Sequence, residues 1–280
     1  MRKGPLNRNS IYFFILALVH LFLLIATLLR KKERITWVLL LTNMGMAYIF
    51  EYVVLNYLQA YKYKPSVVKT RYLDNIFGAI LSQGIYVPIA ATFITVFNGN
   101  WKWRAGFSCY FFLIEKLFLK LGLYKLNWWK PYFTPCLLMI YFFISDRMYH
   151  AMKGKKQWAL ATAQYLALEV IGVSLLYCTA ASRKLRFGLS RYHSWKEHFL
   201  IAPLYSLSLS FLGVLLSFKH HFFYRIVFLG GCMLVDYILI KIGILKMKTR
   251  QILSNIPFHV FMIFLSRQFY KSIYKWGAHE

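Results

Sequence analysis

The chain has 280 residues, of which 59% are hydrophobic, and its formal net charge is +26 at pH 7. This composition excludes a single soluble domain, which could not hide so large an apolar fraction. In a soluble protein this charge would suggest nucleic-acid binding, but the placement of the basic residues argues against it here. Lys and Arg gather in the short connections between apolar runs, where membrane proteins contact anionic headgroups. We therefore expect a multi-pass membrane protein whose partner is a lipid bilayer with anionic headgroups.

The first apolar run extends from Ile11 to Leu29 and is long enough to cross a bilayer as a helix. The basic residues before it are typical of a signal peptide. However, the motif "RKKER" follows at once, and no small-residue cleavage pattern is present. We therefore expect residues 1–34 to hold a basic segment and a retained first helix.

Eight more apolar segments follow the first helix. They lie near residues 35–58, 73–97, 103–124, 128–146, 157–180, 198–218, 223–246 and 252–270. All eight Trp residues fall at or just outside the segment ends, where indole rings gather in membrane proteins. The sequence therefore predicts an all-α polytopic fold with about nine transmembrane helices. Its orientation stays open, because the two sides carry 17 and 15 basic residues, and this favours a cytoplasmic N-terminus only weakly.

Two stretches of the chain share one pattern at an offset of 121 residues. "FFLIEKLFLKLGLYK" begins at Phe111 and "CMLVDYILIKIGILK" begins at Cys232. At the same offset, "FFISDRMY" lies over "IFLSRQFY". We therefore expect an internal duplication, with a first four-helix unit at 35–155 and a second at 157–276. An even number of spans makes the two repeats parallel.

Acidic residues pair in the same order along the two expected units. The pairs are Glu51 with Glu169, Asp74 with Glu197, and Glu115 with Asp236. Of these six residues, all but Asp74 and Glu197 lie inside apolar runs. A carboxylate at the bilayer centre costs on the order of 2.5–3.5 kcal/mol, so these four side chains should face the interior of the helix bundle.

Two features of the neighbouring sequence bear on these acids. Gly122 and Gly243 follow Glu115 and Asp236 by seven residues on the same helical face, which favours close helix contact there. The segments near 131–145 and 252–265 look short, and each contains a proline, Pro135 and Pro257. Short interrupted segments at matching positions of two halves are typical of transporter binding sites.

No motif indicates an enzyme, a cofactor or a metal site. Cys109, Cys136, Cys178 and Cys232 are scattered without a zinc or disulfide pattern. The sequence "HExxH" and the nucleophile-elbow, P-loop and dinucleotide-binding motifs do not occur. We also expect His20 and His259, which stand alone in apolar spans, to be satisfied within the bundle.

Residues 35–150 resemble an uncharacterised family of small multi-pass membrane proteins from spore-forming bacilli and clostridia. The resemblance rests on Glu51, Asp74-Asn75, Ser82-Gln83 and the stretch from Glu115 to Gly122. The second unit lacks the Asp-Asn and Ser-Gln pairs. The resemblance implies a multi-pass helical fold in a bacterial cytoplasmic membrane, and it implies no activity.

Two functional hypotheses follow from the sequence. In the first, the acids Glu51, Glu115, Glu169 and Asp236, with Asp74 and Glu197 as further candidates, line a site that binds or moves a small cation or polar solute. In the second, the protein is a non-transporting sensor or assembly component, and the acids only hold helices together. The oligomeric state is left open by both.

Overall fold

The computed structural model describes residues 7–219, 221–247, 253 and 255–274. Within these residues the chain is 78% helix without a closed sheet, and nine helices follow one another in the expected order. Contacts divide the chain into two compact units, Met1–Ala159 and Leu160–Glu280. Trp276 and His220 lie outside the described residues.

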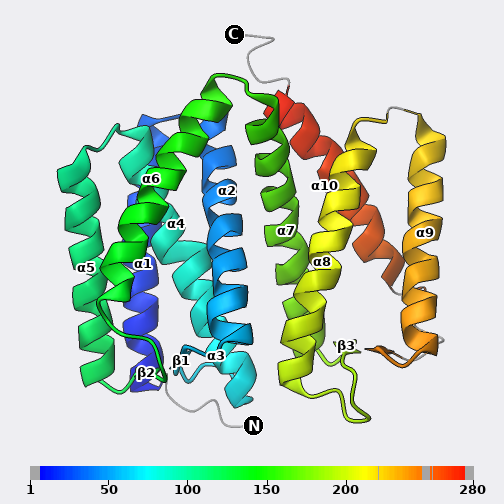
Figure 1. Cartoon of the computed structure of the whole chain (residues 1–280), viewed down its shortest axis with the longest axis horizontal. Coiled ribbons are helices and arrows are strands. Elements are labelled where there is room, and N and C mark those ends of the chain that lie inside the picture. Colours follow the sequence, from blue (N-terminus) through cyan, green and yellow to red (C-terminus); the bar gives the residue numbers. More distant parts are fainter. Residues whose placement is uncertain (1–6, 220, 248–252, 254, 275–280) are drawn as a thin grey trace. The chain divides into compact units, whose positions relative to one another are not determined.

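The first unit contains five helices and a pair of short strands, coloured blue to green in Figure 1. Two of the helices contain a π-helical segment, labelled η1 and η2. The elements are α1 (Arg8–Arg30), α2 (Arg34–Glu51), η1 (Tyr52–Tyr57), β1 (Tyr61–Tyr63), α3 (Arg71–Leu81), η2 (Ser82–Tyr86), α4 (Val87–Val96), α5 (Trp101–Lys120), β2 (Tyr124–Leu126) and α6 (Phe133–Lys153).

The second unit repeats this order of elements without a counterpart of α1. Its elements are α7 (Gln157–Ala181), β3 (Arg186–Phe187), α8 (Trp195–Ser217), α9 (Phe222–Lys241), β4 (Leu245–Lys246) and α10 (Ile256–Tyr274). In both units, a helix, a strand and a helix are followed by a helix, a strand and a helix.

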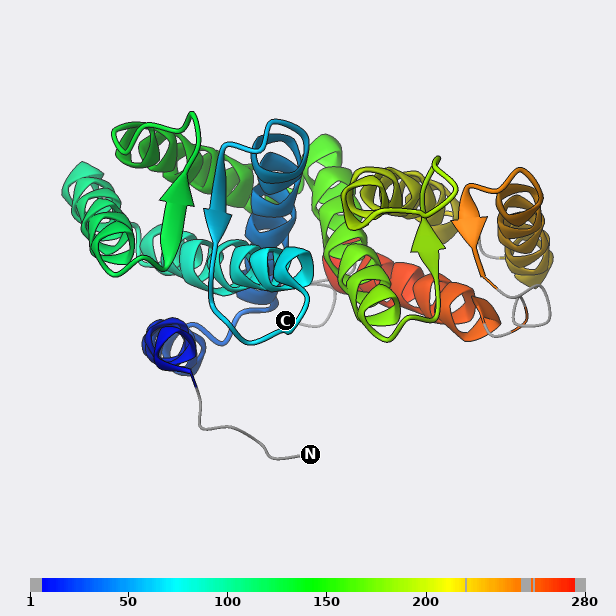
Figure 2. The same cartoon turned by 90° about the horizontal axis from the view of Figure 1, so that it is seen from below.

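Each unit closes one end with an antiparallel strand pair, seen as two arrows among its helices in Figure 2. In the first unit Lys62 lies opposite Lys125, and in the second Arg186 lies opposite Lys246. Lys246 follows Lys125 by 121 residues, the offset found in the sequence. The strand register therefore gives position-by-position equivalence between the units.

The glycines after α5 and α9 end their helices. Gly122 has a φ of +71° and Gly243 a φ of +79°, the left-handed conformation that glycine adopts without strain. The backbone hydrogen bonds around the two glycines also match, at 2.9, 3.1 and 2.9 Å in each unit. A Cβ at either glycine would meet nothing within 4 Å. The interpretation of these residues as close helix contacts is therefore wrong.

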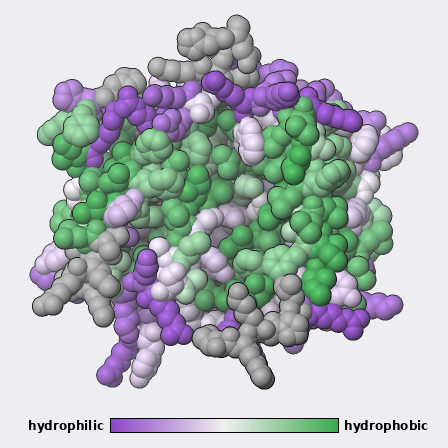
Figure 3. Space-filling view, turned by 180° about the vertical axis from the view of Figure 1, so that it is seen from behind, coloured by the Kyte–Doolittle hydropathy of each residue, from purple (hydrophilic) through white to green (hydrophobic). Residues whose placement is uncertain are grey.

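Six helices are long and apolar enough to cross a membrane in the described part of the chain. They span Arg8–Arg30, Arg34–Tyr57, Arg71–Val96, Gln157–Ala181, Trp195–Ser217 and Phe222–Lys241. The other three, α5, α6 and α10, fall short in apolarity or carry too much charge. In Figure 3 hydrophobic side chains cover the middle of the helices and hydrophilic ones gather at their ends. These are the features of a helical membrane protein.

The prolines of α6 and α10 do not interrupt these helices. Pro135 and Pro257 lie in the first turn, where a missing backbone N–H costs no intrahelical hydrogen bond. The helices are 21 and 19 residues long, so the expectation of short segments is wrong. The irregular backbone lies instead at η1 and η2, directly after Glu51 and around Gln83. Such π-helical segments are frequent at functional sites.

Candidate functional site

Asp236 accepts hydrogen bonds at both oxygens from residues on two other helical segments. The Tyr205 hydroxyl of α8 donates to Oδ1 at 2.5 Å. On the other side, Asn255 Nδ2 and His259 Nε2 lie 2.5 and 2.9 Å from Oδ2. The side chains of Asp236 and His259 are each only 1% exposed. The second unit therefore encloses a carboxyl–imidazole pair shielded from water.

The pattern of α9 explains why this carboxyl group points inward. Only two residues of the helix are buried, Cys232 and Asp236, and they stand one turn apart on the same face. Most of the other side chains are apolar and at least partly exposed, as expected of a helix that faces lipid. The inward face of α9 is thus centred on Asp236. This acid has a basic neighbour, His259, on another helix.

Glu115 is the equivalent of Asp236 in the first unit, and its surroundings are poorer in hydrogen-bond donors. Its side chain is buried, and neither oxygen makes a hydrogen bond of normal geometry. The Thr134 hydroxyl is close enough to interact with it. At the offset of 121, Thr134 corresponds to Asn255, and Leu138 corresponds to His259. The first unit therefore has the carboxyl group without the imidazole.

Glu51 accepts hydrogen bonds from Tyr61 and Gln83. The Tyr61 hydroxyl lies 2.7 Å and Gln83 Nε2 lies 3.2 Å from Oε2. Burial, with the nearby Glu51 charge, raises the pKa of Tyr61 well above its usual value, so the phenol keeps its proton and donates. The two π-helical segments of the first unit begin at these contacts.

A cluster of three tyrosine rings joins the surroundings of Glu51 and Glu115. The ring centres of Tyr61, Tyr63 and Tyr124 lie 5.0–5.6 Å apart. Both carboxyl groups interact electrostatically with Tyr63 and with Tyr124. The two acids of the first unit are thus linked through phenol groups and share no direct contact that we observe among the described residues.

Glu169 has a separate environment in the second unit. Its Oε2 accepts hydrogen bonds from the hydroxyls of Ser206 and Ser210, at 2.8 and 3.2 Å. It does not occupy the position of Glu51 in its helix. In each unit a residue with positive φ stands three residues before the basic strand residue, Gln59 before Lys62 and Arg183 before Arg186. Glu51 precedes Gln59 by eight residues, whereas Glu169 precedes Arg183 by fourteen. Glu169 therefore lies farther from the end of its helix than Glu51 does. The two acids do not occupy equivalent positions, so the expected pairing of Glu51 with Glu169 is wrong.

Asp74 lies in the first turn of α3, next to the loop that joins β1 to this helix. Its carboxylate accepts the backbone N–H groups of Ser66, Val67 and Val68 at 2.7–2.9 Å. The next residue, Asn75, accepts the backbone N–H of β1. These contacts fix the loop and the strand to the start of α3.

Glu197 and His198 fix the corresponding loop and strand to the start of α8 in the second unit. Glu197 accepts the backbone N–H groups of Leu189 and Ser190, and it completes a capping box with Ser194. His198 Nδ1 accepts the backbone N–H of Phe187 at 3.1 Å. Glu197 thus takes the place of Asp74, as paired in the sequence, and His198 takes the place of Asn75, which the difference in residue type concealed.

Five of the six candidate acids therefore have hydrogen-bond partners of their own, and Glu115 has none of normal geometry among the described residues. Among the described residues, no three His, Cys, Asp or Glu side chains come together as a metal site would require. The four cysteines are free, and all but Cys232 are exposed. His259 is the site residue that sequence reasoning missed, because it follows Asp236 by 23 residues on another helix.

Comparison of the chain with protein-family models, with curated proteins and with solved structures found no match.

Proposed function

We propose that the chain is an integral protein of the cell membrane that binds and transfers a proton or another small cation at Asp236. The observation that carries this proposal is the buried hydrogen bond between His259 of α10 and Asp236, which lies on α9, a helix of membrane-spanning character. Ionisable groups inside a membrane protein commonly mark ion pathways and proton relays.

The partners of Asp236 suit reversible protonation. A carboxyl and an imidazole at 2.9 Å can share one proton, and either group can release it. Tyr205 and Asn255 hold the carboxyl group in place without bringing a permanent charge. The site therefore has two charge states that differ by a proton and need little rearrangement. A Lys or Arg partner would instead favour the ionised state of the carboxyl group.

The first unit supports the same proposal through a different arrangement. Glu115 has no strong donor that would hold it ionised, so a bound proton or cation would relieve the cost of its burial. The Tyr61 hydroxyl donates to Glu51, and Tyr63 and Tyr124 of the same cluster interact electrostatically with both Glu51 and Glu115, so their hydroxyls can serve as proton donors and acceptors.

A second candidate function is a membrane sensor or assembly component in which the acids are structural. It is favoured by Glu169, whose carboxyl group is held by two serine hydroxyls, and by Asp74, which fixes a loop. In this case the acids specify how the helices pack and no ion moves.

Proton flux into liposomes distinguishes the two functions. The full chain is reconstituted with a pH-sensitive dye inside, and a potassium gradient with valinomycin sets the membrane potential. We expect Asp236→Asn to lower the flux by at least about tenfold, because the amide cannot exchange a proton. Its thermal unfolding should stay near that of the wild type, since the amide keeps a carbonyl for Tyr205 and its NH₂ can donate to His259 and, once the Asn255 amide turns over, to the Asn255 carbonyl oxygen.

The matched control is Asp146→Asn, which makes the same acid-to-amide change at the partly exposed acid of α6 and should leave the flux unchanged. Wild-type flux in Asp236→Asn would contradict the ion-binding proposal and favour the structural role. The absence of flux in the wild type above empty liposomes would also contradict it. Should Asp236→Asn fail to insert, Asp236→Glu retains a titratable group and should keep measurable flux.

A further inference from the structure

A groove of about 680 Å³ lies between the second half of α1 and the first half of α5 in the first unit. The two helices contact each other at one end of it, where the ring centres of His20 and Phe111 are 5.8 Å apart. Farther along, Gly106 leaves open space beside α5, because a Cβ there would meet nothing within 4 Å. Binding sites for small molecules have volumes of about 300–1,000 Å³, so the groove is large enough for a ligand.

The walls of the groove are mostly apolar and rich in aromatic rings. Phe22 of α1 contributes one ring, and Trp103 and Phe107 of α5 contribute two more. The rings of Trp103 and Phe107 pack against Phe93 of α4, with centres 5.8 and 5.9 Å apart. Such walls favour a ligand that itself has a ring, since edge-to-face and offset ring contacts add to the gain from burial.

His20 brings a hydrogen-bond acceptor into this apolar groove. The residue is 2% exposed, and its Nδ1 lies 2.8 Å from the backbone oxygen of Leu16. A carbonyl oxygen only accepts, so Nδ1 carries the proton and Nε2 of the neutral ring is an acceptor. Among the described residues Nε2 has no hydrogen-bond partner. The same holds for the hydroxyl of Tyr110, whose ring centre lies 6.0 Å from that of His20 and which also lines the groove.

The depth of these two polar groups argues against a phospholipid as the ligand. His20 lies near the middle of α1, a helix of membrane-spanning character. Lys102 and Trp103, at the start of α5, are residues typical of the headgroup level, and Tyr110 follows Lys102 by roughly 12 Å of helix. A phospholipid has its polar groups at the headgroup level, and its acyl chains have no donor. It would leave His20 and Tyr110 unpaired in apolar surroundings.

A phenol satisfies both polar groups with one hydroxyl. Its O–H donates to His20 Nε2, its oxygen accepts from the Tyr110 hydroxyl, and its ring packs against the aromatic walls. An apolar tail on the ring extends through the open side of the groove into the bilayer.

We propose that the groove between α1 and α5 binds a lipid-soluble phenol, a class that includes hydroquinones with apolar tails. The site lies in the first unit and does not involve Asp236, so it is independent of the proposed ion binding.

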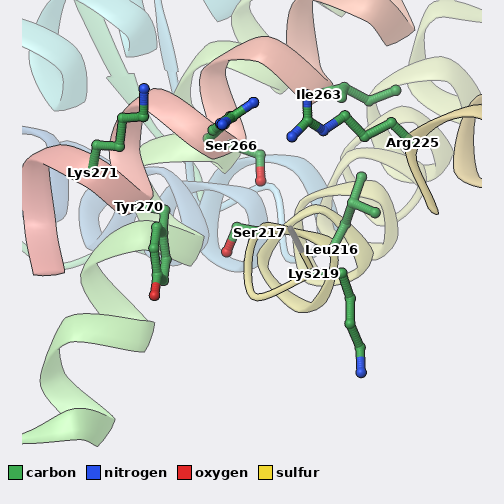
Figure 4. A pocket seen from close by; sticks show the side chains of 9 residues that line it. Leu216, Ser217, Lys219, Arg225, Ile263, Ser266, Tyr270 and Lys271 are labelled. Carbon is green, nitrogen blue, oxygen red and sulfur yellow. The ribbon is translucent and has the colours of Figure 1, made fainter. Parts of the chain in front are cut away.

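The described residues of the second unit lack the parts that build this groove. The unit has no counterpart of α1, and the offset of 121 residues places Gly231 at the position of Tyr110 and Val227 at that of Gly106. The cavity between α8, α9 and α10 in Figure 4 has a volume of only about 50 Å³. Benzene occupies a cavity of roughly 150 Å³, so this one is too small for a substituted ring. We therefore expect about one phenol site per chain.

Equilibrium dialysis with the full chain in nanodiscs tests this proposal, with empty nanodiscs at the same lipid concentration as the reference. The probe is tritium-labelled decylphenol, and the matched compound is decylanisole, in which a methyl group replaces the hydroxyl hydrogen. We expect saturable binding of decylphenol and at least about tenfold weaker binding of decylanisole, because the ether cannot donate to His20.

Three outcomes would overturn the proposal. The first is equal binding of decylphenol and decylanisole, and the second is no saturable binding above the empty nanodiscs. The third is displacement of bound decylphenol by dioctanoyl phosphatidylglycerol at equal concentration, which would identify a phospholipid site.

The decisive variant is Gly106→Leu, which fills the groove with a side chain. Leucine is a good helix former and the space beside Gly106 is open, so the variant should fold. We expect decylphenol binding to weaken by at least about tenfold. The matched control is Gly230→Leu, the same change at a glycine of α9 that also has open space, and it should leave binding unchanged. Unchanged binding in Gly106→Leu would refute the site.

The hydrogen bonds are tested by His20→Phe and Tyr110→Phe, which keep a ring and remove the polar group. Decylphenol binding should weaken by about tenfold in the first and about threefold in the second, while decylanisole binding stays within about twofold of the wild type. Tyr132→Phe removes the hydroxyl of an exposed tyrosine outside the groove and should change neither. Equal losses for both compounds in His20→Phe would show that only ring packing is affected and would contradict the assignment of a phenol.

Discussion

The two units have the same framework and different interiors. Both end the helix after their carboxyl residue at a left-handed glycine, both pair two short strands in the same register, and both fix a loop with a carboxylate. At matching strand positions, however, the first unit has Tyr61, Tyr63 and Tyr124, and the second has Leu185, Phe187 and Leu245. The same backbone arrangement thus accommodates tyrosine side chains at these positions in the first unit and apolar side chains in the second.

This difference explains the different partners of the buried acids. In the first unit the tyrosines supply hydroxyl groups next to Glu51 and Glu115. In the second unit the strands contribute only apolar side chains to the core that includes Leu185, Phe187 and Leu245. A buried carboxyl group needs donors wherever it lies. Asp236 therefore takes its donors from α8 and from α10 with the turn before it.

The largest expected difference between the units concerns Asp236 and Glu115. Asp236→Ala should lower the free energy of unfolding by about 3–5 kcal/mol, because it leaves Tyr205, Asn255 and His259 without their shared acceptor. Glu115→Ala should lower it by no more than about 1–2 kcal/mol, since no hydrogen bond of normal geometry is lost. Chemical unfolding in mixed micelles measures both. Equal losses would mean that the two sites are energetically alike.

A middle-sized effect is expected at Tyr61, whose equivalent in the second unit is a leucine. Tyr61→Phe should cost about 1–2 kcal/mol of unfolding free energy, because Glu51 loses one of its two donors. The matched control is Tyr124→Phe in the same ring cluster, which should change little. In a Glu51→Leu background the cost of Tyr61→Phe should vanish, and a double-mutant cycle measures this. A cost that persists there would place the effect in ring packing.

The smallest effect is expected to be the same in both units. Gly122→Ala and Gly243→Ala should each cost about 1 kcal/mol, because alanine is strained at a φ near +75° while the space around its Cβ is open. Thermal unfolding of the two variants, compared with Gly106→Ala inside α5, measures this cost. Gly106 has open space and a helical backbone, so its replacement should stabilise slightly. Clearly unequal losses at the two glycines would contradict the equivalence of the helix ends.

Local signals located the helices and the buried acids. The apolar runs predicted nine segments, and nine helices lie in the described chain within a few residues of those positions. The cost of exposing a carboxylate to lipid predicted that Glu51, Glu115, Glu169 and Asp236 would be buried, and each is at most 8% exposed. The glycines and prolines were misread. Their meaning depends on whether they stand inside a helix or at its end, and periodicity alone does not fix helix ends.

The residues that complete the sites depend on tertiary structure. His259 reaches Asp236 only because α9 and α10 pack together. The sequence by itself determined which segments are helical and which side chains must avoid lipid, because both follow from the chemistry of each residue and its near neighbours. Helix packing alone decided which donors face each buried acid, because that depends on distances between residues far apart in the chain.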